Sequence, residues 1–381
     1  MTVQEPQLDR PDLPGQEIKL VDCDVHNYFV DGLYDLAPYM PVEWRHRLGL
    51  EAKPPSWMSG INGVTFSLPK NDLYINPTGG LRRDVAGDGP PASDPVAVAQ
   101  DLLDTWGIDR AILLGGAMSG LGALPQYDAA AAVASAYNEW IADRWLREDK
   151  RYRAALLIAP QDPELAAREI HRVAEREGFV AIHVPVLSTL AGERHWYPIY
   201  AAAEEHDLPL MVHPGATESI YPRAPQMGGV PTYYLEWHTM LTQPPQSNLV
   251  SLVCHGVFER FPRLKYVVVE SGFAWAVDVL WRLDRDWKAL RDEVPWVKRS
   301  PSEYVFEHVR FTTQPFIEPK RREHVAAICE ILECDRTLLY SSDYPHWDFD
   351  NPKRALSAIP KTTLDRVFAL NALDTFGDRL R

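Results

Sequence analysis

Lys19-Leu20-Val21-Asp22-Cys23-Asp24-Val25-His26 is the stretch that decides the fold, because an apolar run leads directly into two polar side chains that can bind metal. Side chains on a strand alternate with period two, so Asp24 and His26 point to the same side. A carboxylate and an imidazole at the end of a strand form half of a divalent-metal site. The triplet carries weight only together with similar stretches downstream.

Three later apolar runs also end in residues that can bind metal. They are Met211-Val212-His213, Val268-Val269-Glu270 and Tyr340-Ser341-Ser342-Asp343. The repetition indicates that several strands of one sheet contribute to one site.

Short runs rich in β-branched residues alternate with longer helical stretches along the chain. We expect eight strands, at Ile18–Cys23, Arg110–Leu114, Ala154–Ile158, Val180–Pro185, Pro209–His213, Leu264–Glu270, Val309–Thr313 and Thr337–Ser342. Helical patterning lies between them at Pro95–Trp106, Tyr127–Arg147, Pro163–Glu177, Tyr197–His206, Tyr234–Glu259, Ala274–Arg291 and Lys320–Glu333. This alternation predicts an α/β fold, a (β/α)8 TIM-like barrel with a long insertion after strand 1. A doubly wound open sheet is the alternative, but the first strand is not followed by a Gly-rich phosphate turn.

In a (β/α)8 barrel the active site lies at the carboxyl ends of the strands. Five residues that can bind metal fall at these ends: Asp24, His26, His213, Glu270 and Asp343. His183 and Gln314 fall there as well. We interpret this set as one shared site.

One segment is unusually long for a loop. Residues 53–94 are rich in Pro, Gly and Asn and follow the first strand, so we expect them on the catalytic face as a lid. The candidate substrate-binding residues on this lid are Trp57, Phe66, Tyr74 and Arg82. The alternative is a surface excursion that does not touch a ligand.

Composition limits the class of protein. The 381 residues are 46% hydrophobic, which is enough for one large domain over residues 1–381. The net charge of −14 and the lack of a basic patch argue against nucleic acid as a partner. No apolar run reaches the length of a membrane span, and the polar start of the chain is unlike a signal peptide. The four cysteines show no C-x-x-C spacing, so we expect reduced thiols in a cytoplasmic protein without a membrane partner.

The chain resembles the amidohydrolase superfamily, and within it the branch that includes aminocarboxymuconate-semialdehyde decarboxylase and γ-resorcylate decarboxylase. Three motifs carry the resemblance: Asp24-Val25-His26, the stretch from Gly256 to Lys265 (GVFERFPRLK), and Ser341-Ser342-Asp343-Tyr344-Pro345-His346. The second is long and distinctive.

The resemblance implies a metal site. In this branch the corresponding residues would be the ligands Asp24, His26, His213 and Asp343, with Asp343 also transferring a proton. The cofactor would be one divalent ion, Zn²⁺ or in some decarboxylases Mn²⁺, and we expect Zn²⁺. Relatives are commonly homodimers, and we expect the same here, with a small molecule as substrate.

Two departures from the family pattern affect the chemistry. The family usually has a histidine at the end of strand six, where this chain has Glu270, which could act as a catalytic base, a metal ligand or an anchor for a histidine. The run around His183 contains no lysine, so the bridging carbamylated lysine of binuclear relatives is missing and we expect a mononuclear site.

Three further histidines are candidates for the pocket. If residues 234–259 form one helix that starts at the catalytic face, His238 can contact substrate, whereas His255 lies about 25 Å further along the helix. His183 fits either the pocket wall or the core. His346 follows Asp343 closely and fits either a supporting or substrate-contacting role or a structural turn.

These residues leave the reaction open. We expect a metal-dependent lyase or hydrolase acting on a small cyclic or aromatic acid. One route is non-oxidative decarboxylation with Asp343 as the proton donor. The other is hydrolysis of an amide, lactam or ester with Glu270 or Asp343 as the base. A catalytically inactive binding protein on the same barrel is the alternative from a different class.

Overall fold

Eight parallel strands form the centre of the structure, a computed structural model that describes residues 18–52, 80–82, 84–85, 89–214 and 231–381. Their order in the sheet follows the sequence. The strands are β1 (Val21–Asn27), β2 (Arg110–Gly115), β3 (Tyr152–Leu157), β4 (Phe179–Pro185), β5 (Leu210–His213), β6 (Tyr266–Val268), β7 (Val309–Thr312) and β8 (Leu338–Leu339).

Backbone hydrogen bonds between β1 and the chain just after β8 close the sheet into a barrel. Cys23 N–H donates to the Tyr340 carbonyl at 2.9 Å, and Asp343 N–H donates to the Asp24 carbonyl at 3.1 Å. Val25 forms a parallel bridge with Tyr344. The (β/α)8 barrel predicted from the sequence is confirmed.

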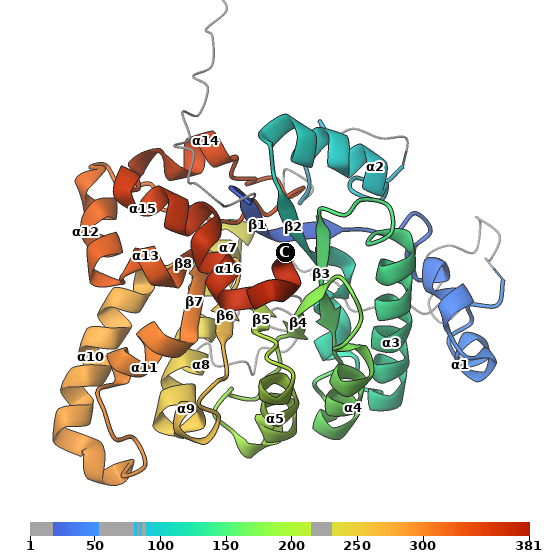
Figure 1. Cartoon of the computed structure of the whole chain (residues 1–381). Helices are drawn as coiled ribbons and strands as arrows, with labels where there is room; N and C mark the ends of the chain where they lie inside the picture. The colour runs from blue at the N-terminus through green and yellow to red at the C-terminus, as the bar shows by residue number, and fades with distance from the viewer. Residues whose placement is uncertain (1–17, 53–79, 83, 86–88, 215–230) are drawn as a thin grey trace, which may run out of the picture.

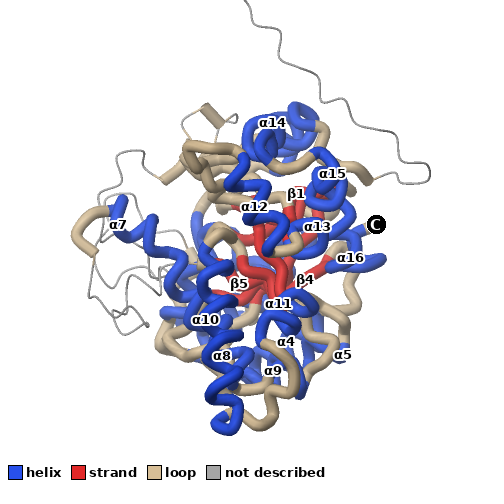
Figure 2. The backbone as a smooth tube through the Cα atoms, turned by 90° about the vertical axis from the view of Figure 1, so that its left-hand side faces the viewer, coloured by secondary structure: helices blue, strands red, loops and turns tan. Residues whose placement is uncertain are grey.

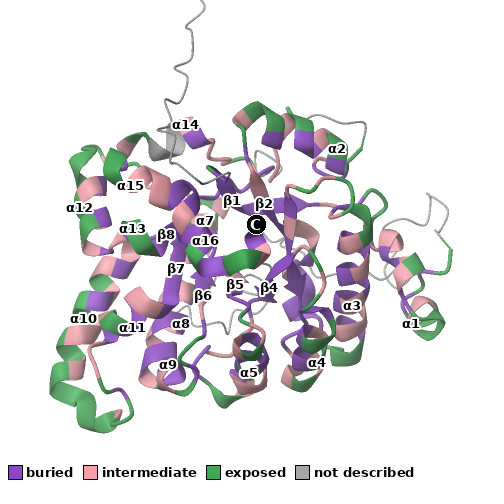
Figure 3. Ribbon diagram, in the orientation of Figure 1, coloured by how far each residue is buried: buried purple, intermediate pink, exposed green. Residues whose placement is uncertain are grey.

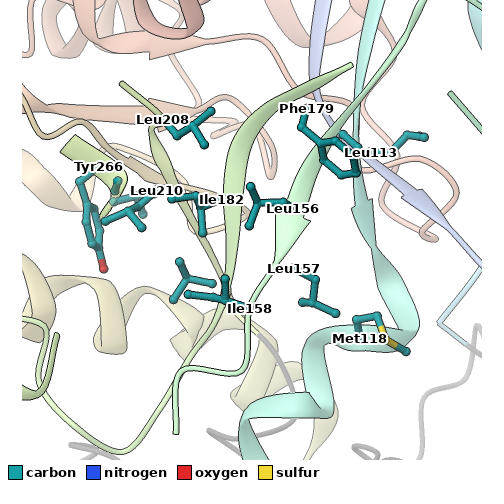
Figure 4. Packing of buried hydrophobic residues seen from close by; sticks show 14 of the residues in the cluster. Leu113, Met118, Leu156, Leu157, Ile158, Phe179, Ile182, Leu208, Leu210 and Tyr266 are labelled. Atoms are coloured by element: carbon teal, nitrogen blue, oxygen red, sulfur yellow. The ribbon is translucent and has the colours of Figure 1, made fainter. Parts of the chain in front are cut away.

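Side chains of the strands divide between two apolar layers. A row that includes Leu156, Ile182, Leu210 and Tyr266 runs through adjacent strands in register and faces the helices (Figure 4). A second, smaller cluster on the inside includes Ala181, Met211 and Val267. Figure 3 shows that the strands are mostly buried, whereas exposed residues lie on the surrounding helices.

Helices surround the barrel, as the tube view in Figure 2 shows, where the strands lie inside the helical layer. Their bounds are α1 (Val42–Arg47), α2 (Pro95–Val98), α3 (Tyr127–Arg144), α4 (Pro163–Val173), α5 (Tyr197–Glu205), α7 (Tyr234–Thr239), α8 (Gln243–Cys254), α9 (Val257–Arg260), α10 (Trp275–Leu290), α11 (Pro301–His308), α12 (Glu323–Ile331), α13 (Cys334–Thr337), α14 (Pro352–Ala355), α15 (Lys361–Asp365) and α16 (Asn371–Phe376).

Helix α16 covers the end of the barrel at which the strands begin (Figure 1). Phe376 is buried in the inner apolar cluster. Arg110 and Arg153, near the starts of β2 and β3, donate to the backbone carbonyls of residues 379–381. With this end closed, the opposite end is the one that offers a site.

Some boundaries differ from those predicted. Strand β1 runs on through Asp24 and His26 to Asn27, so both candidate ligands lie within the strand and not beyond it. The single helix predicted over residues 234–259 is wrong: α7 ends at Thr239, a short 3₁₀ turn follows, and α8 starts with Pro244 and Pro245 in its first turn. Proline fits the first turn of a helix but not its interior, which explains why a new helix begins there.

The described end of the predicted lid lies beside the loop that follows β8. Leu81 forms an antiparallel bridge with His346, and Arg82 N–H donates to the Pro345 carbonyl at 2.9 Å. This is the end of the barrel at which the strands finish. Residues 53–79, including Trp57, Phe66 and Tyr74, lie outside the described residues, so their contact with substrate stays a prediction.

Candidate metal centre

Five ligand-type side chains from four strands meet at the carboxyl end of the barrel. Asp24 and His26 come from β1, His213 ends β5, Glu270 lies two residues after β6, and Asp343 follows β8. All five are buried, and Glu270 is the most exposed of them at 9%. The structure therefore brings together the set that the sequence singled out.

The ligand atoms lie close to one another. His26 Nε2 is 3.0 Å from Asp343 Oδ1 and 3.4 Å from Asp24 Oδ1. His213 Nε2 is 2.9 Å from Glu270 Oε2 and 3.8 Å from Asp24 Oδ2. Two donors that bind one ion at about 2.1 Å lie about 3.0 Å apart at a right angle and about 3.4 Å apart at the tetrahedral angle. Three of the observed separations, 2.9, 3.0 and 3.4 Å, agree with this range, and the His213–Asp24 separation of 3.8 Å is slightly longer.

Both histidines present the same nitrogen to the centre. His26 Nδ1 donates to the Leu114 carbonyl at 2.9 Å, and His213 Nδ1 donates to the Pro214 carbonyl. A carbonyl oxygen only accepts, so in each ring the proton is on Nδ1 and Nε2 faces the carboxylates. Such a bond fixes the tautomer and orientation of a metal-binding imidazole.

Several buried polar atoms at the centre lack a hydrogen-bond partner among the described residues. They include both carboxylate oxygens of Asp24 and the Nε2 atoms of His26 and His213. Ion pairs of Asp24, Glu270 and Asp343 within the described part of the chain are all with histidines. Buried carboxylates without a cation are costly, so the donor set fits a divalent ion.

The pKa of the Asp24 carboxyl reflects the repulsion among the buried carboxylates. Burial raises its pKa well above the ordinary value, and repulsion from Asp343 and Glu270 adds to this against the attraction of His26. A divalent ion at the centre would favour the ionised carboxylate.

Asp343 and His346 form a tight pair. His346 Nδ1 lies 2.5 Å from Asp343 Oδ1, and His346 Nε2 lies 3.0 Å from the Tyr28 hydroxyl. Burial alone would raise the pKa of Asp343, but the attraction and hydrogen bond of His346, together with the nearby His26, lower it below the ordinary value. Burial alone would lower the pKa of His346, but Asp343 raises it well above the ordinary value. The shared proton therefore resides on His346.

A hydrogen-bonded chain continues from Asp343 toward His238. Gln314 Nε2 donates to Asp343 Oδ2 and to Asp348 Oδ2, each at 3.0 Å. His238 Nε2 lies 3.2 Å from Asp348 Oδ2. Burial lowers the pKa of His238, but its hydrogen bond to Asp348 outweighs this and raises it. His238 is therefore linked to the centre through Asp348 and Gln314, and its contact with substrate stays a prediction.

Glu270 and Asp343 both adopt the left-handed backbone conformation, with φ of 47° and 58°. This conformation costs residues other than glycine about 1–3 kcal/mol and persists where surrounding contacts hold it. The Glu270 N–H donates to Thr312 Oγ1 at 3.0 Å. Both carboxylates are thus aimed by a local backbone turn at the end of a short strand.

The remaining predicted residues are placed less directly. His183 is buried next to His213, with 6.1 Å between ring centroids, and neither of its ring nitrogens has a partner within the described residues. Burial lowers the pKa of His183 well below the ordinary value, so it is neutral. Arg82 pairs with Asp84 at 2.9 Å and lies over the Phe349 ring, so its charge is already engaged and its role in substrate binding stays a prediction.

Sequence reasoning missed residues that support the centre. Asp22 Oδ1 accepts hydrogen bonds from the backbone N–H groups of Asp24 and Ser342, so it ties the ligand-bearing parts of β1 and of the loop after β8 together. Tyr28 and Asp348 extend the network described above. Asp22 and Tyr28 each lie two residues from a predicted ligand on the same strand or just beyond it, which was the available signal.

Comparison with known proteins assigns the family. The amidohydrolase family matches residues 23–377, so the chain belongs to that family. Among curated relatives, γ-resorcylate decarboxylase of Rhizobium radiobacter is 27% identical over 280 residues, covering 70% of this chain and 81% of the relative.

Solved structures share the fold. An amidohydrolase from Mycobacterium avium subsp. paratuberculosis K-10 superposes with a TM-score of 0.70 at 20% identity, covering 95% of this chain and 98% of that one. A dihydroxybenzoic acid decarboxylase from Polaromonas sp. JS666, solved with manganese and the inhibitor 2-nitroresorcinol, gives 0.64 at 20% identity, covering 94% and 97%.

Proposed function

We propose that this protein is a divalent-metal-dependent decarboxylase of a hydroxylated aromatic acid. The observation that carries the proposal is the convergence of Asp24, His26, His213 and Asp343, whose facing atoms lie 3.0–3.8 Å apart in the pairs described above. Family membership and the curated γ-resorcylate decarboxylase relatives support the reaction.

Asp24, His26, His213 and Asp343 would hold the ion. When bound, it would supply a Lewis acid and a positive charge that bind an anionic substrate among the carboxylates. We propose Mn²⁺ as the first ion to test and Zn²⁺ as the second, since the Polaromonas decarboxylase structure contains manganese.

The chemistry that the protein itself must provide is a proton for carbon. Loss of carbon dioxide leaves an electron pair on the ring carbon, which then takes up a proton. His346 Nδ1 lies 2.5 Å from Asp343 Oδ1, and Asp343 lies at the centre beside His26. We assign proton delivery to Asp343, with His346 as the group that resupplies it and Tyr28 as the group that orients His346.

Aromatic side chains surround His238, which Asp348 and Gln314 link to this pair. Tyr234 stacks on His238 with 5.6 Å between centroids, and Trp347 lies 5.4 Å from His238. Trp347 is 40% exposed. We propose that His238 contacts the substrate and that these neighbouring rings form one wall of the pocket.

The test is carbon dioxide release from a panel of hydroxylated aromatic acids, beginning with 2,6-dihydroxybenzoate and 5-carboxyvanillate. The protein is first stripped of metal and then reloaded with Mn²⁺ or Zn²⁺. We expect release that requires metal and is lost in His213→Ala. Metal-loaded protein that releases none from any acid of the panel would contradict the proposed reaction.

Hydrolysis is the second candidate, and one observation favours it. Glu270 occupies the position of the family's histidine and places a carboxylate 2.9 Å from His213 Nε2, where a base for an attacking water is needed. Amides, lactones and esters of aromatic acids belong in the same panel. Cleavage of these without carbon dioxide release would favour the hydrolase.

We also propose a cytoplasmic homodimer. Among the described residues, no helix has the length and apolar character needed to cross a membrane. Trp281 and Leu290 on α10 are 61% and 58% exposed, and they offer apolar surface for a second copy. A monomeric mass in light scattering would contradict the dimer.

A further inference from the structure

We propose that Glu270 is a fifth protein ligand of the metal and biases this centre toward hard ions such as Mn²⁺. The inference rests on the proposed metal site and extends it by a residue that replaces the family's histidine. It concerns metal coordination, so its test does not depend on knowing the substrate.

Glu270 faces the ring nitrogen of His213 that points toward the centre. An outer residue that only anchors a metal-binding histidine bonds to the ring nitrogen that points away from the ion. In His213 that nitrogen is Nδ1, and it already donates to the Pro214 carbonyl. Glu270 Oε2 lies 2.9 Å from Nε2, the nitrogen that faces the centre. The geometry therefore excludes the anchor role and makes the two atoms neighbours in one coordination sphere.

The donor atom of Glu270 lies close to those of the other candidate ligands. Two groups can be defined within which all donor atoms lie within 4.8 Å of one another. One group is Asp24, His26 and His213, and the other is His26, Glu270, Asp343 and His346. His26 belongs to both groups, and His213 is in contact with Glu270. In His346 the Nδ1 atom is bonded to Asp343 and Nε2 to the Tyr28 hydroxyl, so both of its nitrogens are used. Five side chains remain as ligands.

The backbone conformation directs the Glu270 side chain inward. Its φ of 47° is held by the hydrogen bond from its N–H to Thr312 Oγ1 on the neighbouring strand β7. Thr312 is fully buried. A side chain that only faced solvent would not need this turn.

A five-residue set with three carboxylates has chemical consequences. Carboxylate oxygens suit Mg²⁺ and Mn²⁺, whereas imidazole at the same position would suit Zn²⁺ as well. An octahedral ion held by five side chains keeps one position open, so a substrate would bind the ion through a single oxygen.

The experiment compares metal binding by the full chain and three variants. Dissociation constants for Mn²⁺ and Zn²⁺ are measured by competition with a chromogenic chelator for wild type, Glu270→Gln, Glu270→His and the matched control Glu259→Gln. The control makes the same substitution at a glutamate on α9 that pairs with Lys298 and is outside the donor set. A crystal structure of the Mn²⁺-loaded wild type gives the distance from Glu270 to the ion.

We expect Glu270→Gln to weaken Mn²⁺ binding by at least about tenfold, and to weaken it more than Zn²⁺ binding, whereas Glu259→Gln changes Mn²⁺ binding less than about threefold. Glu270→His should recover Zn²⁺ affinity more than Mn²⁺ affinity. In the crystal we expect a Glu270 oxygen about 2.2 Å from manganese.

Two results would overturn the proposal, and only the second would also contradict the proposed metal site. If Glu270→Gln binds Mn²⁺ like wild type and the Glu270 oxygens lie beyond 3 Å from the ion, on the order of an outer-sphere distance, Glu270 is not a ligand while the four-residue site stands. If folded wild type binds no divalent ion, both the proposed site and this inference fail.

Discussion

Asp22→Asn should change how the stability of the metal-stripped protein depends on pH. Asp22 is completely buried, and Oδ1 accepts from the backbone N–H groups of Asp24 and Ser342. Burial raises its pKa from 3.8 to about 7, although the hydrogen bonds from Ser342 and Asp24 act in the opposite direction. Asparagine keeps an accepting oxygen at the same place but cannot ionise.

The direction follows from proton binding. The unfolded chain releases the Asp22 proton near pH 3.8, whereas the folded chain keeps it up to about pH 7. Between these values the folded state binds the extra proton, so its stability falls as pH rises, by about 1.4 kcal/mol per pH unit. Over the whole interval the raised pKa contributes at most about 4 kcal/mol to the free energy of unfolding. This contribution is fully present below pH 3.8 and is lost above pH 7.

The assay is urea unfolding of wild type and Asp22→Asn with a chelator at several values from pH 4.5 to pH 8. The other titrating groups are common to both proteins and cancel in the difference, apart from Asp24 and Asp343, whose charges interact with that of Asp22. We expect wild type to lose stability relative to the variant as pH rises, by a few kcal/mol over this range. Curves that stay parallel would refute a buried Asp22 that is protonated at neutral pH.

Three further predictions follow from the centre and from the closed end of the barrel. Mn²⁺ at about 100 times its dissociation constant should add about 2.7 kcal/mol to the free energy of unfolding of wild type, which raises Tm by about 3 °C for a chain of this length. Scanning calorimetry should show this rise in wild type but not in His213→Ala. Phe376→Ala should cost about 3–5 kcal/mol in urea unfolding, because Phe376 is only 2% exposed, and should leave Mn²⁺ affinity unchanged; a loss of metal affinity would contradict the separation of the two ends. His346→Gln should lower kcat for decarboxylation by about 10²–10⁴-fold while one ion per chain remains, and an unchanged kcat would remove His346 from proton transfer.

The fold could be predicted because its signals are local. Runs such as Ala154–Ile158 and Val180–Pro185 are apolar and lie between helical stretches, and the structure has β3 and β4 there. Helix α4 begins at Pro163, and the Asp162 side chain accepts from the N–H groups of Glu164 and Leu165 in its first turn.

The convergence of the candidate ligands could be predicted for a different reason. Strand ends meet at one edge of a barrel, so Asp24, His213 and Asp343 come together once the eight strands are recognised. Support from the loops was not predictable in this way. The contacts of Gln314 with Asp343 and Asp348 depend on the path of the chain after β7 and β8, and sequence periodicity does not describe that path.

Boundaries were missed where tertiary contacts overrode local pattern. Strand β1 continues through polar Asp24 and His26, because backbone bonds to Tyr340 and Tyr344 on its open side extend the ladder. The helix predicted over residues 234–259 breaks before Pro244, a signal that was present in the sequence and was outweighed by the apolar periodicity.

Metal content is the most direct test of a metal-dependent enzyme built on these residues. Elemental analysis of purified protein, reloaded with Mn²⁺ or Zn²⁺ and dialysed, should find about one ion per chain in wild type and none in His213→Ala. Folded wild-type protein that retains no divalent ion after reloading would contradict the metal centre and with it the proposed chemistry.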